Sequence, residues 1–164
     1  MASFDLVIFD CDGVLVDSER IANEVFAKVL NEECGFTLEL SDMFEIFVGH
    51  SLAQCMQIIE RMLGAKPPAG LQQRYTDEIN AALSESVTAV AGIEQALAQL
   101  TIPYCVASSG SYEKMHITLG RAKLLELMLG KLHSTADVAR GKPFPDIFLH
   151  AARTMGATDP RRCL

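Results

Sequence analysis

Residues 4–18 read FDLVIFDCDGVLVDS, in which a nearly continuous apolar run over residues 4–9 is broken by Asp10. A short apolar run of this kind, closed by polar residues, is typical of a strand buried in a parallel sheet. The polar residues that follow such a strand lie at its carboxyl end, where open α/β sheets bind their ligands. This one stretch therefore predicts both a fold class and the place of a site.

Two further segments have the character of buried strands, residues 102–107 and residues 131–134. Stretches with helical periodicity separate them, and another helix is predicted to follow the segment KPFPD at residues 142–146. Strands that alternate with helices indicate βαβ units. We therefore predict an α/β fold with a parallel sheet.

Between the first and second strands, residues 18–87 carry apolar side chains at helical spacing. Ser18, Ser41 and Ser51 each precede such a helical stretch, and they are predicted to be its N-cap. We expect an α/β core formed by residues 1–16 and 89–164, with an all-helical domain of residues 17–88 inserted into it.

The composition excludes several classes of protein. Hydrophobic residues make up 49% of the 164 residues, which is enough to bury a core. Fourteen Lys and Arg against 21 Asp and Glu give a net charge of −7, which does not suit a nucleic-acid-binding face. The sequence has no apolar run of membrane-spanning length, no C-x-x-C pair among its five cysteines and no basic segment of a secretion signal. These features predict a cytoplasmic protein without a nucleic-acid or membrane partner.

Candidate functional residues follow each of the three predicted strands. Asp10 and Asp12 follow the first strand, Ser108 and Ser109 follow the second, and Lys142 comes after the third. Because parallel strands end at the same edge of the sheet, these side chains are expected to converge on one crevice. An isolated Asp-x-Asp is usually a solvated turn or a helix cap, but a buried strand and a glycine flank this pair.

The string from Asp10 to Ser18, D-x-D-G-V-L-x-D-S, resembles the first motif of the haloacid dehalogenase superfamily. Ser108 at the end of an apolar strand matches the second motif. Lys142 matches the third motif of the phosphatase and phosphomutase branch, which includes phosphoglycolate phosphatase and β-phosphoglucomutase. The resemblance runs from about residue 4 to residue 164, and it implies a Rossmann-like parallel sheet with an inserted helical cap domain.

The resemblance also implies a reaction. Asp10 would be the nucleophile that forms an aspartyl phosphate, and Asp12 would be the general acid and base. Lys142, Ser108 and Ser109 would bind the transferring phosphoryl group, and backbone N–H groups around Cys11 and Ser109 would add donors. Mg²⁺ would be held by an Asp10 oxygen and the Asp12 carbonyl. The expected function is hydrolysis of a small phosphorylated metabolite, such as a sugar phosphate or a phosphoglycolate-like acid.

Other polar residues have weaker claims. His50 or Ser51 in the inserted domain could contact the substrate, although a helix start and a surface histidine explain them as well. Lys114 and His116 are interpreted as members of a solvated helix face.

The family has a fourth motif, an acidic pair at the end of a further strand, and this pair completes the Mg²⁺ site. That strand is expected near Cys163-Leu164, and no acidic pair is found there. We therefore expect a C-terminally shortened core whose residues 6–9 form an uncovered sheet edge, with a risk of edge-strand association. The full-length enzyme is expected to be a monomer.

Three alternatives remain at the level of the sequence. A phosphosugar mutase often has a histidine early in the inserted domain, where Ala22 stands here. A dehalogenase uses a similar nucleophile but usually has no second acid, so Asp12 argues against it. A shortened chain could also be an inactive fragment that only binds phosphate or pairs with itself.

Overall fold

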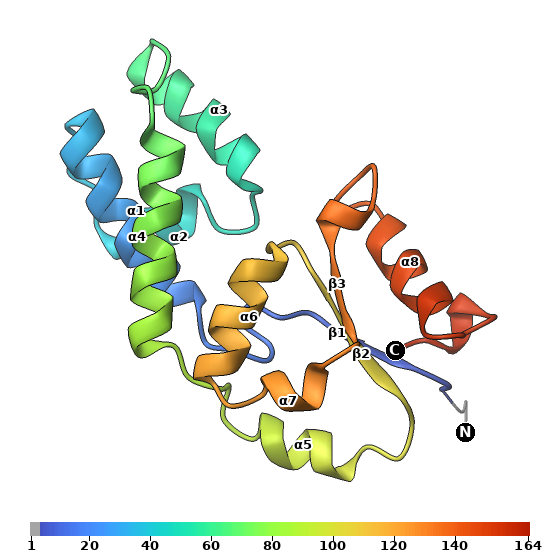
Figure 1. The fold of residues 1–164 in the computed structure, drawn as a ribbon. Helices are drawn as coiled ribbons and strands as arrows, with labels where there is room; N and C mark the ends of the chain where they lie inside the picture. The colour runs from blue at the N-terminus through green and yellow to red at the C-terminus, as the bar shows by residue number, and fades with distance from the viewer. Residues whose placement is uncertain (1–3) are drawn as a thin grey trace. The chain divides into compact units, whose positions relative to one another are not determined.

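The computed structural model describes residues 4–164, which include a three-stranded parallel sheet (Figure 1). The strands β1 (Val7–Phe9), β2 (Tyr104–Ser108) and β3 (Leu132–Ser134) lie in the order β1-β2-β3. Ile8 pairs with Cys105, and Ala107 pairs with His133. All three strands are parallel, so the α/β fold predicted from the alternation of strands and helices is confirmed.

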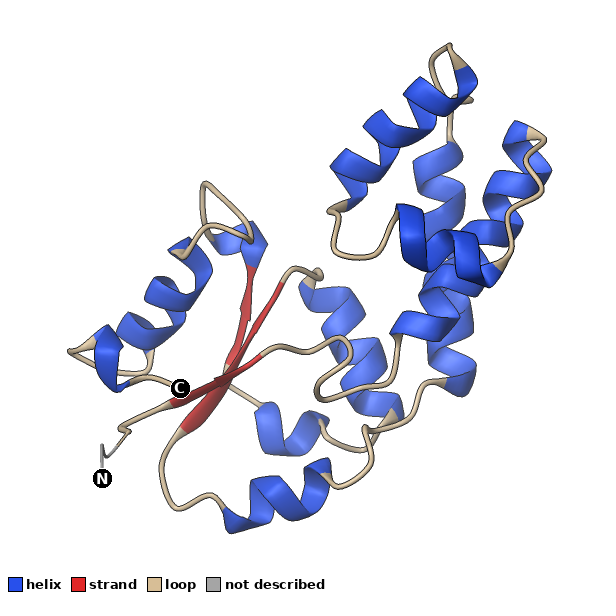
Figure 2. Ribbon diagram, turned by 180° about the vertical axis from the view of Figure 1, so that it is seen from behind, coloured by secondary structure: helices blue, strands red, loops and turns tan. Residues whose placement is uncertain are grey.

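Helices cover both faces of this sheet. Helix α8 (Asp146–Thr154) lies on one face, and α6 (Tyr112–Arg121) with α7 (Leu125–Met128) lies on the other (Figures 1 and 2). Outside the segment between β1 and β2 that forms α1 to α4, the remaining elements are α5 (Ile93–Gln99) and the short 3-10 turns η1 (Thr135–Asp137) and η2 (Pro160–Arg162). In the part of the chain that the structure describes, no helix is long and apolar enough to cross a membrane.

The face under α8 is closed by small and medium-sized apolar side chains. The residue just before β1 and residues of β2 pack there against residues of α8, namely Leu6, Cys105, Ala107, Ile147, Ala151 and Ala152. The alternation of side chains along a strand explains why every second residue of β2 takes part. Small residues let the helix approach the sheet closely.

The outer side of β1 is paired rather than uncovered. Leu164 donates its N–H to the Leu6 carbonyl at 2.9 Å, and Ile8 donates its N–H to the Leu164 carbonyl at 2.7 Å. Leu6 also forms a parallel bridge with Cys163. The prediction of an uncovered apolar edge is therefore wrong for Leu6 to Ile8, because a two-residue pairing is enough to satisfy their backbone.

The chain divides into two compact units. The first, here called the core unit, comprises the described residues up to Ser18 together with Ser86–Leu164. The second, the helical unit, is Glu19–Glu85 and contains α1 (Glu19–Cys34), α2 (Leu40–Ile46), α3 (Leu52–Leu63) and nearly all of α4 (Leu71–Ser86).

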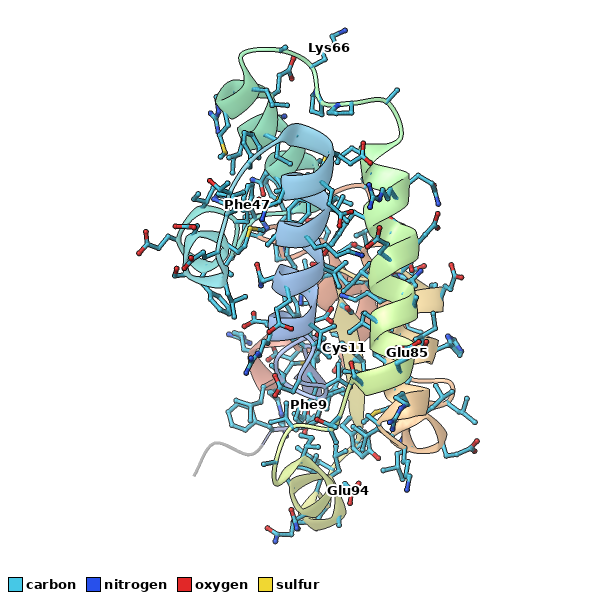
Figure 3. The ribbon with its side chains drawn as sticks, turned by 90° about the vertical axis from the view of Figure 1, so that its left-hand side faces the viewer. Phe9, Cys11, Phe47, Lys66, Glu85 and Glu94 are labelled. Carbon is cyan, nitrogen blue, oxygen red and sulfur yellow. The ribbon has the colours of Figure 1, made fainter. Side chains whose placement is uncertain are left out.

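The helical unit has a hydrophobic core of its own. Phe26 of α1 is buried, and its ring meets the ring of Phe47 edge-on at 5.2 Å between centroids. Phe47 is labelled in Figure 3. Leu30, Met43 and Ile59 are fully buried in the same cluster. The apolar stripes of the predicted helices therefore face one another, as amphipathic helices require.

Two predicted helix caps have different outcomes. Ser51 caps α3, because its hydroxyl accepts the Gln54 N–H and the Gln54 side chain accepts the Ser51 N–H. Ser41 does not cap α2, which begins at Leu40, and the Asp42 carboxylate instead accepts the Glu39 N–H at 2.7 Å. The serine lies inside the first turn, so the acidic residue after it supplies the cap interaction.

Candidate active site

Asp10 and Asp12 lie in a tight loop that follows β1. Figure 3 labels Phe9 and Cys11, the residues on either side of Asp10. The Cys11 carbonyl accepts the Leu15 N–H at 2.9 Å, and Gly13 donates its N–H to the Val16 carbonyl at 2.8 Å. Gly13 has a φ of 73°, a left-handed conformation that favours glycine. This turn holds both carboxylates at the carboxyl end of the sheet.

Asp10 is paired with Lys142 across the site. The Lys142 Nζ lies 2.9 Å from Asp10 Oδ1, and the same oxygen accepts the Cys11 N–H at 2.7 Å. Both contacts end on Oδ1, and in the described part of the chain Oδ2 takes no hydrogen bond. The Asp10 side chain is 43% exposed, so its free oxygen can reach a ligand. The Cys11 N–H, predicted as a donor to phosphate, is directed to Asp10 here.

Asp12 has two partners that the sequence did not predict. The Lys114 Nζ lies 2.8 Å from Asp12 Oδ1, and the Ser18 hydroxyl donates to the same oxygen at 2.6 Å. The interpretation of Lys114 as part of a solvated helix face is therefore wrong. The Ser18 hydroxyl that donates to Asp12 is buried, and Ser18 directly precedes α1.

A signal for Lys114 was present in the sequence. Ser111 caps α6 by accepting the Lys114 N–H, which places Lys114 in the first turn of that helix. The amino end of a helix carries partial positive charge, so a lysine there is unfavourable unless an anion compensates it. Because α6 begins directly after β2, that anion had to lie at the carboxyl edge of the sheet.

Ser108 to Gly110 form a turn beside the two carboxylates. The Ser108 side chain is fully buried, and its Oγ accepts the Gly110 N–H at 2.9 Å. A Cβ atom built on Gly110 would lie 3.3 Å from Ser108 Oγ and 3.8 Å from Asp12 Oδ2. Ser109 is exposed, and its carbonyl accepts the Thr135 hydroxyl at 3.2 Å. The turn thus joins the ends of β2 and β3 and faces Asp12.

Lys142 is carried by the loop between β3 and α8. The Lys142–Pro143 peptide bond is cis. Arg140 forms a two-pronged ion pair with Asp146 at 3.0 and 2.9 Å, which ties this loop to the start of α8. The Lys142 Nζ also lies 5.2 Å from the centre of the Phe148 ring. The lysine is therefore held from one side by a ring and from the other by Asp10.

Cys11 stands between the two carboxylates without being a nucleophile. Burial, reinforced by the charge of Asp12, raises the pKa of the Cys11 thiol to about 12. The thiol is therefore protonated at neutral pH, and only a thiolate is strongly nucleophilic.

The structure brings Asp10, Asp12, Ser108 and Lys142 to one edge of the sheet, with Ser109 exposed beside them. His50 and Ser51 belong to the helical unit, where both are exposed and Ser51 serves as the cap of α3. His116 is exposed on α6, and its Nδ1 lies 2.7 Å from the Tyr112 carbonyl.

The charged side chains at this edge of the sheet balance one another. Two ammonium groups stand against two carboxylates, so the cluster formed by Asp10, Asp12, Lys114 and Lys142 has no net charge. Each lysine contacts only one oxygen of its carboxylate. A phosphate dianion that enters would meet both lysines, but it would also need further positive charge to approach the carboxylates.

Comparison with known proteins gives the class to which this arrangement belongs. Residues 4–164 match the family of haloacid dehalogenase-like hydrolases, and the chain is a member of that family. It is 34% identical over 158 residues to 6-phosphogluconate phosphatase of Escherichia coli, covering 94% of this chain and 70% of that protein. The family and this relative confirm the prediction of a phosphoric monoester hydrolase.

Solved structures agree with the fold. A conserved haloacid dehalogenase-like protein of unknown function from Agrobacterium tumefaciens superposes with a TM-score of 0.86 at 34% identity, covering 98% of this chain and 72% of that one. A hydrolase of the family from Deinococcus radiodurans, solved with bound phosphate and sodium, gives a TM-score of 0.76 at 33% identity, covering 99% and 72%. The predicted Rossmann-like core is thereby confirmed.

Proposed function

We propose that this enzyme hydrolyses a small phosphorylated metabolite through an aspartyl phosphate on Asp10. The observation that carries the proposal is the pair of carboxylate–ammonium contacts, Asp10 with Lys142 at 2.9 Å and Asp12 with Lys114 at 2.8 Å. Phosphoryl transfer needs a nucleophile, cationic groups for the phosphoryl oxygens and a proton donor for the leaving oxygen. These four residues supply all three at one edge of the sheet.

In the first step, Asp10 attacks phosphorus with its exposed carboxylate, and the bond from phosphorus to the substrate oxygen breaks. Lys142 is the cation nearest to Asp10, so it neutralises charge on the phosphoryl oxygens. The Ser108 hydroxyl and the Ser109 N–H would add hydrogen-bond donors to the phosphoryl group.

Asp12 protonates the leaving oxygen and then removes a proton from the water that hydrolyses the aspartyl phosphate. Lys114 and Ser18 both contact Oδ1, which leaves Oδ2 as the oxygen that carries the proton. Oδ2 is also the oxygen nearer to Gly110 and the Ser108 turn. Lys114 and Ser18 are therefore positioning residues that orient the acid.

The donors fit a magnesium ion. The Asp10 carboxylate and the Asp12 main-chain carbonyl are oxygen ligands of the kind that Mg²⁺ prefers, and Asp10 Oδ2 takes no hydrogen bond in the described part of the chain. Bound there, Mg²⁺ would supply the positive charge that a phosphate dianion needs beside two carboxylates.

We further propose that the core comprises residues 1–16 and 89–164, and that residues 17–88 form a cap domain whose His50 and Ser51 select the substrate. In support, the chain leaves and returns to the core side by side, because Asp17 donates its N–H to the Thr88 carbonyl at 2.9 Å. The named relative acts on 6-phosphogluconate, which supports a phosphorylated sugar acid as the substrate class.

The test is phosphate release from a panel of sugar phosphates, phosphorylated sugar acids and p-nitrophenyl phosphate, with and without Mg²⁺. Mg²⁺-dependent release that prefers a phosphorylated sugar acid supports the proposal. Conversion of a sugar phosphate to an isomer without phosphate release would contradict it.

A further inference from the structure

A second group of metal-ligating side chains lies on the α8 side of the sheet. It consists of His133 in β3, Asp137 in η1 and His150 in α8. One ring nitrogen of each histidine and one carboxylate oxygen lie within 4.8 Å of one another. His150 Nε2 is 4.0 Å from Asp137 Oδ2, and the two imidazole rings meet edge-on with centroids 5.5 Å apart.

An unsatisfied buried nitrogen points independently to a ligand. His133 is only 4% exposed, and its Nε2 is buried without a hydrogen-bond partner in the part of the chain described. Buried polar atoms are nearly always hydrogen-bonded, so such an atom requires an explanation. Burial, together with the neighbouring His150, also lowers the pKa of His133, which favours the neutral imidazole that binds metals.

Asp137 is oriented in the way that metal-binding carboxylates usually are. Its Oδ2 accepts the Tyr112 hydroxyl at 2.7 Å and the Ser134 N–H at 3.0 Å. Hydrogen bonds of this type fix a carboxylate ligand and are a regular part of metal sites. Both end on Oδ2, which leaves Oδ1 for a further ligand.

The cluster is also accessible. Asp137 and His150 line a surface cleft of about 410 Å³, together with Arg140 and Arg153. The charge of Arg140 is balanced by its ion pair with Asp146, and Arg153 donates to the Leu149 carbonyl. The cleft gives a cation access to Asp137 and His150, and a ring nitrogen of His133 lies within 4.8 Å of their ligand atoms.

We propose that His133, Asp137 and His150 bind a divalent transition-metal ion of the zinc class, at a site separate from Asp10. Two imidazole nitrogens and one carboxylate are typical of Zn²⁺ and Co²⁺, whereas Mg²⁺ selects oxygen ligands. Tetrahedral zinc places its ligand atoms about 3.4 Å apart. The present separations must therefore shorten by roughly 1 Å, which side-chain rotation of the part-exposed His150 toward Asp137 allows.

The proposal does not depend on the phosphatase reaction. Its structural consequence is a link between the metal and the turn at Gly110, since Asp137 holds the Ser134 N–H while the Ser134 hydroxyl donates to the Gly110 carbonyl at 2.8 Å. Metal binding should therefore stiffen the loop that follows β3.

The test is Zn²⁺ binding to the metal-free full chain, measured by competition with a chromophoric chelator. His150→Ala is the principal variant because His150 is part-exposed and its loss leaves the core intact. Asp137→Asn is the second variant, and His116→Ala is the control because His116 is exposed on α6, outside the cluster. Visible absorption of bound Co²⁺ reports on the ligand geometry.

We expect one Zn²⁺ per chain, at least tenfold weaker binding in His150→Ala and Asp137→Asn, and unchanged binding in His116→Ala. Zn²⁺ should also raise the unfolding temperature of the wild type and not that of His150→Ala. Failure of the wild type to bind Zn²⁺ would overturn the proposal. Equal binding by the wild type and His150→Ala would also overturn it, because the ion would then be held elsewhere.

Discussion

Replacing Lys142 by methionine should remove most of the activity while leaving the fold in place. Methionine keeps an unbranched apolar side chain but removes the ammonium group, which lies 2.9 Å from Asp10 Oδ1 and 5.2 Å from the centre of the Phe148 ring. In the proposed reaction this ammonium neutralises charge that moves onto the phosphoryl oxygens, so its loss should fall mainly on the transition state.

The distance sets the size of the effect. Two unit charges 2.9 Å apart attract by about 1.4 kcal/mol in water and about 5.7 kcal/mol at an effective dielectric constant of 20. Lys142 is 21% exposed but Asp10 is 43% exposed, so solvent screening places the value in the lower half of this range. A loss of about 2–3 kcal/mol corresponds to a roughly 30- to 150-fold lower kcat/KM.

The assay is phosphate release at saturating Mg²⁺, with inorganic phosphate as a competitive inhibitor to report on ground-state binding. Lys28→Met is the matched control, because Lys28 forms an ion pair of similar length, 2.8 Å to Glu78, within the helical unit. It should leave kcat/KM unchanged. If folded Lys142→Met keeps more than half of the wild-type kcat/KM, Lys142 does not neutralise the phosphoryl group.

Three further substitutions test other parts of the account. Asp12→Asn should lower kcat by about 10²–10⁴-fold with little change in KM, because the proton is transferred only in the transition state; a raised KM with normal kcat would make Asp12 a binding group. Gly110→Ala should weaken inhibition by phosphate without loss of fold, because its Cβ would lie 3.3 Å from Ser108 Oγ; unchanged inhibition would remove this turn from the phosphate site. Ile147→Ala, at a fully buried position, should lower the free energy of chemical unfolding by about 2–5 kcal/mol. Leu149→Ala on the same helix is the control and should lower it much less, because Leu149 is 39% exposed. Equal losses in the two variants would refute the described packing of α8.

The sequence was most informative where chemistry and local pattern coincide. The apolar run before Asp10 predicted β1, and polar residues after each strand predicted which edge of the sheet holds Asp10, Asp12, Ser108 and Lys142. Parallel strands bring their carboxyl ends together, so the topology alone is enough for this inference.

The contacts between elements were beyond such reasoning. Lys114 and Ser18 lie 96 positions apart along the chain, yet both contact Asp12 Oδ1. Periodicity says which face of a helix is apolar, but it does not say which carboxylate a polar side chain meets. The pairing of Cys163 and Leu164 with the segment at β1 agrees with the further strand that was expected there, although the edge of β1 was predicted to be uncovered.

The cluster of His133, Asp137 and His150 shows the same limit of pattern reading. Its members come from a strand, a 3-10 turn and a helix, without the spacing of a recognisable metal motif. They meet because β3 places His133 on the face of the sheet that α8 covers. Strand alternation alone does not predict this face; it follows only once the pairing of His133 with Ala107 of β2 is known.

The claim that Asp10 is the nucleophile is tested most directly by trapping its phosphorylated form. The enzyme is quenched during turnover, the acyl phosphate is reduced with borohydride, and the modified residue is located by peptide mass spectrometry. The account predicts modification at Asp10 alone, and no modification in Asp10→Asn, which should also lack activity. A reduced acyl phosphate at any other carboxylate, or turnover by a folded Asp10→Asn protein, would contradict it.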